Sequence, residues 1–216
     1  MIGVARRGNE NLTDYKKLEY YARKELDAAA PRTFAVLEPV LLEIVNFDKI
    51  KDKKITAPLF PLEQDKGSQT YTLTKNVYIE ADDFSETVKE GHFGLMPGQA
   101  VVLRYGPHIR MKEVVKDANG KIVKVLVEHV EPEKVKGVIH WVSKEHSLTA
   151  HVNLYNVLFL VQDVIGTASK ENKDFCDFVN PDSLVHKKEA KVWNLHKDVK
   201  AYDRFQFERV GYFCVD

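Results

Sequence analysis

Residues 109–130 read IRMKEVVKDANGKIVKVLVEHV, and this stretch decides the fold class. Valine and isoleucine recur on both sides of Asn119-Gly120, and branched residues of this kind favour β-strands. An Asn-Gly pair readily takes the positive φ angles of a type I′ turn. The stretch therefore predicts a hairpin in which residues 109–116 and 122–130 are strands joined by a two-residue turn.

Similar short apolar runs continue on both sides of this hairpin. They are bounded by turn residues and predict strands within 36–47, 70–73, 77–79, 100–104, 138–142, 150–160 and 205–215. The polar segments 49–54, 64–68 and 163–174 are predicted as loops. Many short strands separated by turns favour a mainly β fold made of barrels over an open parallel sheet.

A single long helical pattern precedes the strands, over residues 11–30. Its apolar residues recur at spacings of three and four, which places them on one helical face: Leu12, Tyr15, Leu18, Ala22 and Leu26. Asn11 or Thr13 is the expected N-cap. Pro31 ends the helix, because the residue before a proline is pushed out of the helical region.

The composition limits the class of protein. A chain of 216 residues with 44% hydrophobic residues can build a real core, as one large domain or two small ones. The 32 basic residues balance 32 acidic ones, which argues against a general nucleic-acid binder. RNA binding would therefore depend on local basic patches. No apolar run has the length of a membrane helix, and two cysteines, Cys176 and Cys214, fit a reduced protein of the cytoplasm.

No complete catalytic constellation is visible. His140, His146 and His151 lie close together, but the paired spacing of a zinc site is absent. The glycines of 91–98 lack the spacing and the lysine of a phosphate-binding loop. Asp82-Asp83 is interpreted as a structural pair on a solvated turn, and Cys214, between aromatic and branched residues, is expected in a core.

Basic residues beside aromatic ones are the more promising feature. Arg104-Tyr105, Arg204-Phe205 and Lys134 with Lys136 before Trp141 have this character. Unstacked RNA bases are recognised by stacking on aromatic or guanidinium planes and by bonding of their edges. Alternation along strands yields the same mixture when aromatics fill a core and charges face water. Spacing alone leaves both interpretations open.

The chain resembles, along nearly its whole length, the anticodon-binding region of class I glutaminyl-tRNA synthetases. The segments that carry the resemblance occur in order: Ile2-Gly3-Val4 with Asn11, Arg23 to Leu26, Ala30 to Val36, Pro97-Gly98-Gln99, Val102 to Arg104, Lys116 to Gly120, Lys134 to Ser143, Leu154 to Phe159, Asn180 to Val185, and Phe205 to Asp216. The resemblance implies two β-barrels of the type found in 5S rRNA-binding ribosomal proteins. Residues 1–33 would form a helical connector, 88–159 a distal barrel, and 34–87 together with 160–216 a proximal barrel.

The resemblance also implies a function and partners. Such enzymes attach glutamine to its tRNA using ATP and magnesium, and the barrels grip the anticodon loop of tRNA(Gln). The motifs that carry the reaction are absent here, so the chain is expected to be a non-catalytic C-terminal fragment that follows the enzyme's own catalytic domain. No cofactor, metal, membrane or DNA is expected for the fragment itself.

Four residues match positions that contact the anticodon in the family. Arg32 matches an arginine near the anticodon, and Arg104 matches one that lines the pocket of the first base. Gln206 and Arg209 match residues that read the middle base and its surroundings. Gln206 can present both a donor and an acceptor to a uracil edge.

The chain departs from the family pattern at three places. Gly94 stands where an arginine often reads the last base, Phe93 replaces a lysine of some members, and no polar contact residue is found near Leu62. Lys89, Lys134 or Lys136 would have to substitute for the missing contacts.

Three alternatives remain on sequence grounds. Glutamyl-tRNA synthetases of the eukaryotic and archaeal type share the barrel architecture. A stand-alone RNA-binding barrel protein is a second possibility, disfavoured by the helix before Pro31. A protein-interaction module is the third, and it applies if the basic residues prove scattered in space.

Overall fold

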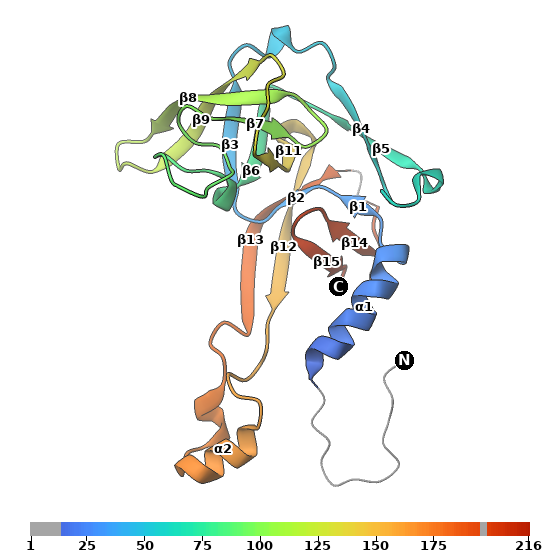
Figure 1. Cartoon of the computed structure of the whole chain (residues 1–216), viewed down its shortest axis with the longest axis vertical. Helices are drawn as coiled ribbons and strands as arrows, with labels where there is room; N and C mark the ends of the chain where they lie inside the picture. Colours follow the sequence, from blue (N-terminus) through green and yellow to red (C-terminus); the bar gives the residue numbers. More distant parts are fainter. Residues whose placement is uncertain (1–13, 195–197) are drawn as a thin grey trace.

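The largest part of the molecule is a seven-stranded sheet that curls into a nearly closed barrel (Figure 1). The structure is a computed structural model and describes residues 14–194 and 198–216. In sheet order the strands are β10 (Val138–Ile139), β7 (Ala100–Leu103), β8 (His108–Lys116), β9 (Ile122–Val130), β3 (Pro39–Ile44), β6 (Asn76–Glu80) and β11 (Trp141–Ser143). Only His140 separates the two end strands, β10 and β11, so the edges of the sheet meet at this residue.

The barrel is filled by the inward-facing residues of these strands. Leu42, Ile79 and Ile109 are completely buried, and their neighbours two residues away on the same strand point the same way. Trp141 is also fully buried, and its indole Nε1 donates to the backbone oxygen of Arg104 at 3.1 Å. Trp141 is therefore part of the barrel core.

A second, smaller core lies between two three-stranded sheets. One contains β12 (Ser147–Tyr155), β13 (Leu184–Trp193) and β2 (Ala35–Val36), and the other contains β1 (Arg32–Thr33), β14 (Arg204–Phe207) and β15 (Gly211–Cys214). The buried residues of this core are Ala35, Leu37, Val152, Ala190 and Phe207. A separate two-stranded sheet, β4 (Lys54–Pro58) with β5 (Ser68–Thr72), lies beside the barrel.

Residues 32–36 connect all of these bodies. β1 joins the C-terminal hairpin and β2 joins the β12–β13 sheet. Between them, the ring of Phe34 enters the barrel core and stacks on Tyr71, with 4.4 Å between the ring centroids. A five-residue segment therefore fixes the C-terminal hairpin against the barrel.

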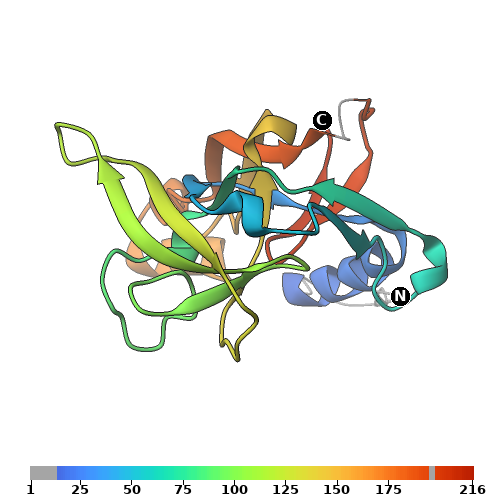
Figure 2. The same ribbon diagram turned by 90° about the horizontal axis from the view of Figure 1, so that it is seen from above.

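Two helices extend from the β body (Figures 1 and 2). α1 (Tyr15–Ala29) precedes the first strand, and α2 (Val164–Glu171) sits at the far end of the long β12–β13 ribbon. Short 3₁₀ turns occupy Phe47–Lys49 (η1), Gln64–Lys66 (η2), Ala81–Asp83 (η3), Lys144–His146 (η4) and Phe175–Phe178 (η5). No helix of the described residues is long and apolar enough to span a membrane.

The mainly β prediction is confirmed, and the predicted hairpin is the β8–β9 pair. Its turn differs from the type I′ prediction, because only Gly120 has a positive φ, of 79°, and Asn119 does not. Asp117 is the reason: its Oδ1 accepts the N–H groups of Asn119 and Lys121, both at 2.9 Å. The carboxylate thus stabilises a longer turn than the two-residue one expected.

The helical predictions need two corrections. Asp14 caps α1 by accepting from the N–H of Lys16, in place of Asn11 or Thr13, which with Leu12 lie outside the described residues. None of its residues is buried, and most of the predicted apolar face lies open, with Leu26 half-buried. Residues 163–174, expected to be a loop, contain α2, because Asp163 caps its start and Asn172 takes a left-handed conformation at its end.

Strand β13 was missed by the sequence patterns. It carries four charged residues and a histidine among ten, so no clean alternation reveals it. The division of the chain into a connector, a distal barrel and a two-part proximal barrel stays a prediction. Strand pairs in the structure join residues from different parts of that division. β3 and β6, from residues 34–87, pair with β9 and β11, and β12 pairs with β13 of residues 160–216.

Candidate nucleic-acid interface

The C-terminal hairpin brings Arg32 and Gln206 together. β1 and β14 run parallel, and their register places Arg32 opposite Gln206. The Nε of Arg32 donates to Oε1 of Gln206 at 2.9 Å. Since a guanidinium can only donate, the amide must present its oxygen to Arg32 and its NH₂ group elsewhere. Two of the four predicted contact residues therefore form one unit.

This unit lines a cavity of about 180 Å³. The walls come from α1, from the turn between β4 and β5, and from β14. Its lining residues are Lys24, Asp27, Ala28, Ala30, Arg32, Phe60, Pro61, Leu62, Glu63 and Gln206. Leu62 is 94% exposed at this site, where a polar contact was expected from the family pattern. The cavity thus joins a polar edge to an apolar wall.

α1 is tied to the same hairpin by a polar contact. The hydroxyl of Tyr212, on β15, donates to the carboxylate of Asp27. Burial, together with this hydrogen bond, raises the pKa of Tyr212 to about 12. The phenol therefore stays protonated at neutral pH and keeps Asp27 at the edge of the cavity.

Arg104 forms an ion pair with Glu208 on the turn after β14. Its Nε donates to Oε1 of Glu208 at 2.6 Å, and Nη2 lies 2.5 Å from the same oxygen. The guanidinium also lies over the ring of Tyr105, 4.8 Å from its centroid. Burial alone would lower the pKa of Arg104, but the contact with buried Glu208 outweighs it and raises that pKa.

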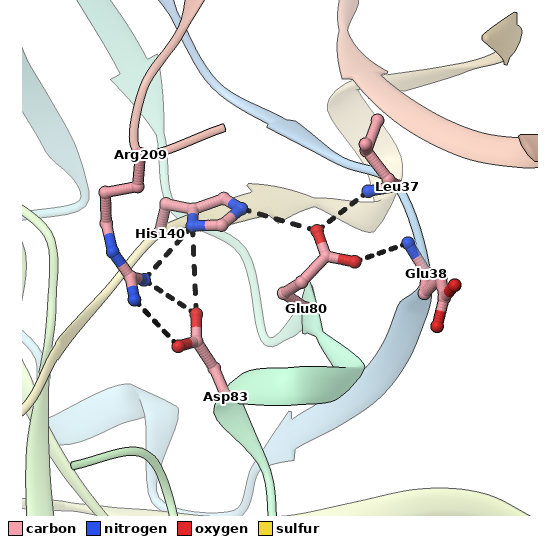
Figure 3. Close-up of polar contacts among 6 residues, drawn as sticks. All are labelled: Leu37, Glu38, Glu80, Asp83, His140 and Arg209. Carbon is pink, nitrogen blue, oxygen red and sulfur yellow. Dashed lines mark hydrogen bonds and ion pairs between the residues drawn. The ribbon is translucent and has the colours of Figure 1, made fainter. Parts of the chain in front are cut away.

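Arg209, the next residue, pairs with Asp83 in a two-pronged contact (Figure 3). Nη1 donates to Oδ2 at 2.7 Å and Nη2 donates to Oδ1 at 2.8 Å. Nη1 also lies 3.2 Å from Nδ1 of His140, which is 3% exposed at the barrel seam. Because arginine has no acceptor, Nδ1 of His140 carries no proton and its proton sits on Nε2.

Glu80 completes this network on the other side of His140. Its carboxylate accepts the N–H groups of Leu37 and Glu38, at 2.9 and 2.6 Å, and lies 3.6 Å from Nε2 of His140. Burial alone would raise the pKa of Glu80, but the contacts with His140 and the two backbone groups outweigh it and lower that pKa. Glu80 therefore stays ionised and fixes the start of β3.

The four predicted residues thus fall into two kinds. Arg32 and Gln206 contact each other beside a cavity, whereas Arg104 and Arg209 are each paired with a carboxylate. The sequence reasoning missed both partners. It placed Asp83 on a solvated turn, but the side chain is only 13% exposed, and its partner lies 126 residues away in the chain. No local signal connects residues at that distance.

Gly94 has a steric reason to differ from the family's arginine. A Cβ at this position would lie 2.2 Å from the backbone oxygen of Asp83, which accepts the N–H of Leu95 at 2.7 Å. Any side chain would therefore clash with backbone. Lys89, Lys134 and Lys136, the proposed substitutes, are all exposed.

The histidines and cysteines considered in the sequence analysis are scattered over the structure. Among the described residues, no group of three or more histidines, cysteines and carboxylates is arranged to hold a metal ion. Both cysteines are free and exposed, so the expectation that Cys214 packs in a core is wrong. Cys214 lies on the outward side of β15, the last strand of its sheet.

Comparison with known proteins identifies the relatives of this chain. Residues 30–130 match a family model described as "tRNA synthetases class I (E and Q), anti-codon binding domain". Residues 138–216 match a second model with the same description. The two matches together take in both the barrel and the C-terminal hairpin.

Curated relatives named glutamine–tRNA ligase align with nearly the whole chain. The protein of Neisseria meningitidis is 39% identical, and the alignment covers 96% of this chain and 39% of the relative. Those of Cupriavidus metallidurans and Ectopseudomonas mendocina are each 38% identical, over all of this chain and 38% and 40% of the relative. The chain spans about two fifths of the length of these relatives.

Proposed function

Because this chain belongs to the anticodon-binding domain family of the class I tRNA synthetases for glutamate and glutamine, we propose that it recognises the anticodon loop of a glutamine tRNA. The observation that carries this proposal is the Arg32–Gln206 pair on the wall of a small cavity. Its volume of about 180 Å³ lies below the ~300–1,000 Å³ of pockets for drug-sized ligands. A single unstacked base fits that scale.

The hydrogen-bonding groups of this pair favour a base that offers acceptors. Oε1 of Gln206 is engaged by Arg32, so the free amide hydrogens of Gln206 are donors. Among the residues that the structure describes, Nη1 and Nη2 of Arg32 have no acceptor. A carbonyl oxygen of uracil, the middle base of a glutamine anticodon, can accept from these donors. The second lone pair of Oε1 of Gln206 can accept the N3–H of the same base. The proposal therefore keeps the prediction that Gln206 presents both a donor and an acceptor to a uracil edge.

Arg104 and Tyr105 supply a second element of the proposed interface. Tyr105 is 40% exposed and its ring is roughly parallel to that of Phe34 behind it. Aromatic rings and guanidinium planes are the surfaces on which unstacked bases pack. Glu208 keeps the guanidinium of Arg104 over this ring, so a base can stack here while Nη1 remains available for hydrogen bonds.

The activity of a longer protein follows as a further part of the proposal. The relatives are named glutamine–tRNA ligase, and the chain spans about two fifths of their length. We assign to this chain the reading of tRNA(Gln) for an enzyme that joins glutamine to that tRNA in the cytoplasm. ATP and magnesium would be used by the catalytic domain, which would be the partner of this region, and not by the residues described here.

The test is binding of the 216-residue chain, at low salt, to RNA stem-loops that differ only in the anticodon. One carries the glutamine anticodon CUG, one the glutamate anticodon CUC, and one an unrelated triplet. Tighter binding of the CUG loop is expected. Preference for CUC would move the chain to the glutamate enzyme, and equal binding of all three would indicate a general RNA-binding protein.

A further inference from the structure

Arg209 occupies a backbone position that disfavours arginine. It is the third residue of the turn Phe207–Val210, in which the N–H of Val210 donates to the oxygen of Phe207 at 2.9 Å. Its φ is +68°, and glycine or asparagine usually provides a positive φ at this place in a turn. Such unfavourable backbone conformations gather at functional sites. The side chain must therefore be held by contacts that outweigh the preference of the backbone.

The contacts of the guanidinium divide its donors into a held set and a free set. A guanidinium has five N–H donors in two planar forks, one at the end and one at the side. The end fork, Nη1 with Nη2, is held by both oxygens of Asp83, and the other hydrogen of Nη1 points to Nδ1 of His140. Among residues 14–194 and 198–216, nothing accepts from Nε or from the second hydrogen of Nη2. These two donors make up the complete side fork.

We propose that Asp83 and His140 are positioning residues for RNA recognition: they hold the end of the Arg209 guanidinium and leave its side fork free for an RNA acceptor. This inference rests on the proposed function, since it concerns how one predicted anticodon contact is presented. The side chain of Arg209 is 38% exposed, whereas that of Asp83 is 13% exposed. A base edge with two adjacent acceptors binds such a fork, and a contact of this kind carries sequence information.

Both positioning residues are themselves fixed by the barrel. The backbone oxygen of Asp83 accepts from Leu95 at 2.7 Å, and η3 precedes an isolated bridge between Phe84 and Leu95. His140 sits at the seam between β10 and β11, and it lies between the carboxylates of Glu80 and Asp83 at 3.6 and 3.8 Å. The C-terminal turn therefore takes its position from the rigid side of the molecule.

The inference is tested by Asp83→Asn with Asp82→Asn as its matched control. The two substitutions remove the same charge from the same 3₁₀ turn, but Asp82 is exposed and Asp83 holds Arg209. The measurement is the ratio of the dissociation constants of the 216-residue chain for the CUG loop and the unrelated loop. We expect Asp83→Asn to reduce this ratio about tenfold, the size of one lost base-edge fork, and Asp82→Asn to leave it unchanged.

Further variants separate positioning from folding. Arg209→Ala should reduce the ratio as much as Asp83→Asn, and the double variant should be no worse than Arg209→Ala alone, because the two residues act as one unit. At position 140, asparagine places an amide oxygen near the site of Nδ1 and should retain the ratio, whereas His140→Leu should lose it. Melting temperatures of all variants report folding independently of RNA.

The outcomes distinguish the inference from the proposed function. If Arg209→Ala loses discrimination while folded Asp83→Asn and His140→Leu keep it, Arg209 reads RNA without these partners and the inference is wrong. If Asp83→Asn does not fold, the comparison of His140→Asn with His140→Leu decides in its place. If the unsubstituted chain itself does not discriminate among the loops, the proposed function fails first.

Discussion

The barrel seam and the Arg32–Gln206 cavity use polar groups in opposite ways. At the seam, the indole of Trp141 donates to the backbone of Arg104, Glu80 accepts two backbone N–H groups, and the aromatic rings are buried. At the cavity, one donor of Arg32 and the acceptor Oε1 of Gln206 contact each other, and no other side chain of residues 14–194 and 198–216 pairs with these two. Polar groups whose hydrogen bonds are made within the protein stabilise a fold, whereas polar groups with donors or acceptors to spare can bind a ligand. The seam should therefore govern stability and the cavity should govern recognition.

Removing the largest ring of the seam should give the greatest effect. Trp141→Ala deletes a fully buried indole that packs against Phe34 and Tyr71, and we expect a loss of about 3–5 kcal/mol in the free energy of unfolding. Denaturant unfolding of the chain measures it. Trp141→Phe keeps a ring but loses the hydrogen bond to Arg104, so it should cost less. Equal midpoints for Trp141→Ala and the unsubstituted chain would contradict the comparison.

A second change tests the backbone packing beside the seam. Gly94→Ala sets a methyl group against the backbone oxygen of Asp83, and we expect a loss of about 1–3 kcal/mol in stability from overpacking. Thr87→Ala, at an exposed position of the same loop, is the control and should change little. Thermal unfolding of the two variants measures the difference in stability. Equal melting temperatures would mean that the backbone near residue 94 moves to accept the methyl group without loss of stability.

Gln206→Ala should act on the other side of the comparison. We expect it to weaken binding of the CUG loop by about 1–3 kcal/mol, the size of a lost base contact, while the melting temperature changes little. Gln162→Ala, an exposed residue beside α2, is the matched control for binding. If Gln206→Ala lowers the melting temperature and leaves the affinity for the CUG loop unchanged, Gln206 stabilises the fold and does not contact RNA.

The smallest effect is expected from a surface ion pair of the barrel. Lys124 and Lys75 pair with the two oxygens of Glu43 and lower its pKa to about 2. A lowered carboxyl pKa stabilises the fold above the unfolded value of 4.5, and this contribution is lost as the pH falls from 4.5 towards about 2. Glu43→Gln should remove that part of the pH dependence of unfolding. An unchanged pH profile would show that solvent screens the pair.

The regular elements were predictable because their signals are local. The β8–β9 hairpin follows from branched residues around a turn sequence, and the end of α1 follows from Pro31. β13 was not predictable in this way, because four charged residues interrupt its alternation. Two of them, Lys187 and Lys191, are half-buried on this strand. The exposure of the apolar face of α1 was not predictable either. Helical periodicity places apolar residues on one face, but it does not show whether another part of the protein packs against that face.

The candidate site was likewise predictable only in part. The resemblance of the sequence singled out Arg32, Arg104, Gln206 and Arg209, and it marked Gly94 as a departure. It could not show that Gln206 faces Arg32, that Glu208 and Asp83 hold the other two arginines, or that the backbone of Asp83 leaves no room for a side chain at residue 94. These contacts join residues up to 174 positions apart.

By itself, the sequence determined the mainly β class, the position of the central hairpin and the family to which the chain belongs. The tertiary structure decided which charged residues are available for RNA and which are paired within the protein. The physical reason is that strand and turn propensities act between neighbours, whereas an ion pair forms wherever folding brings opposite charges within a few ångströms. Closure of the barrel at His140 sets that distance here, because it brings Asp83 within reach of the turn that carries Arg209.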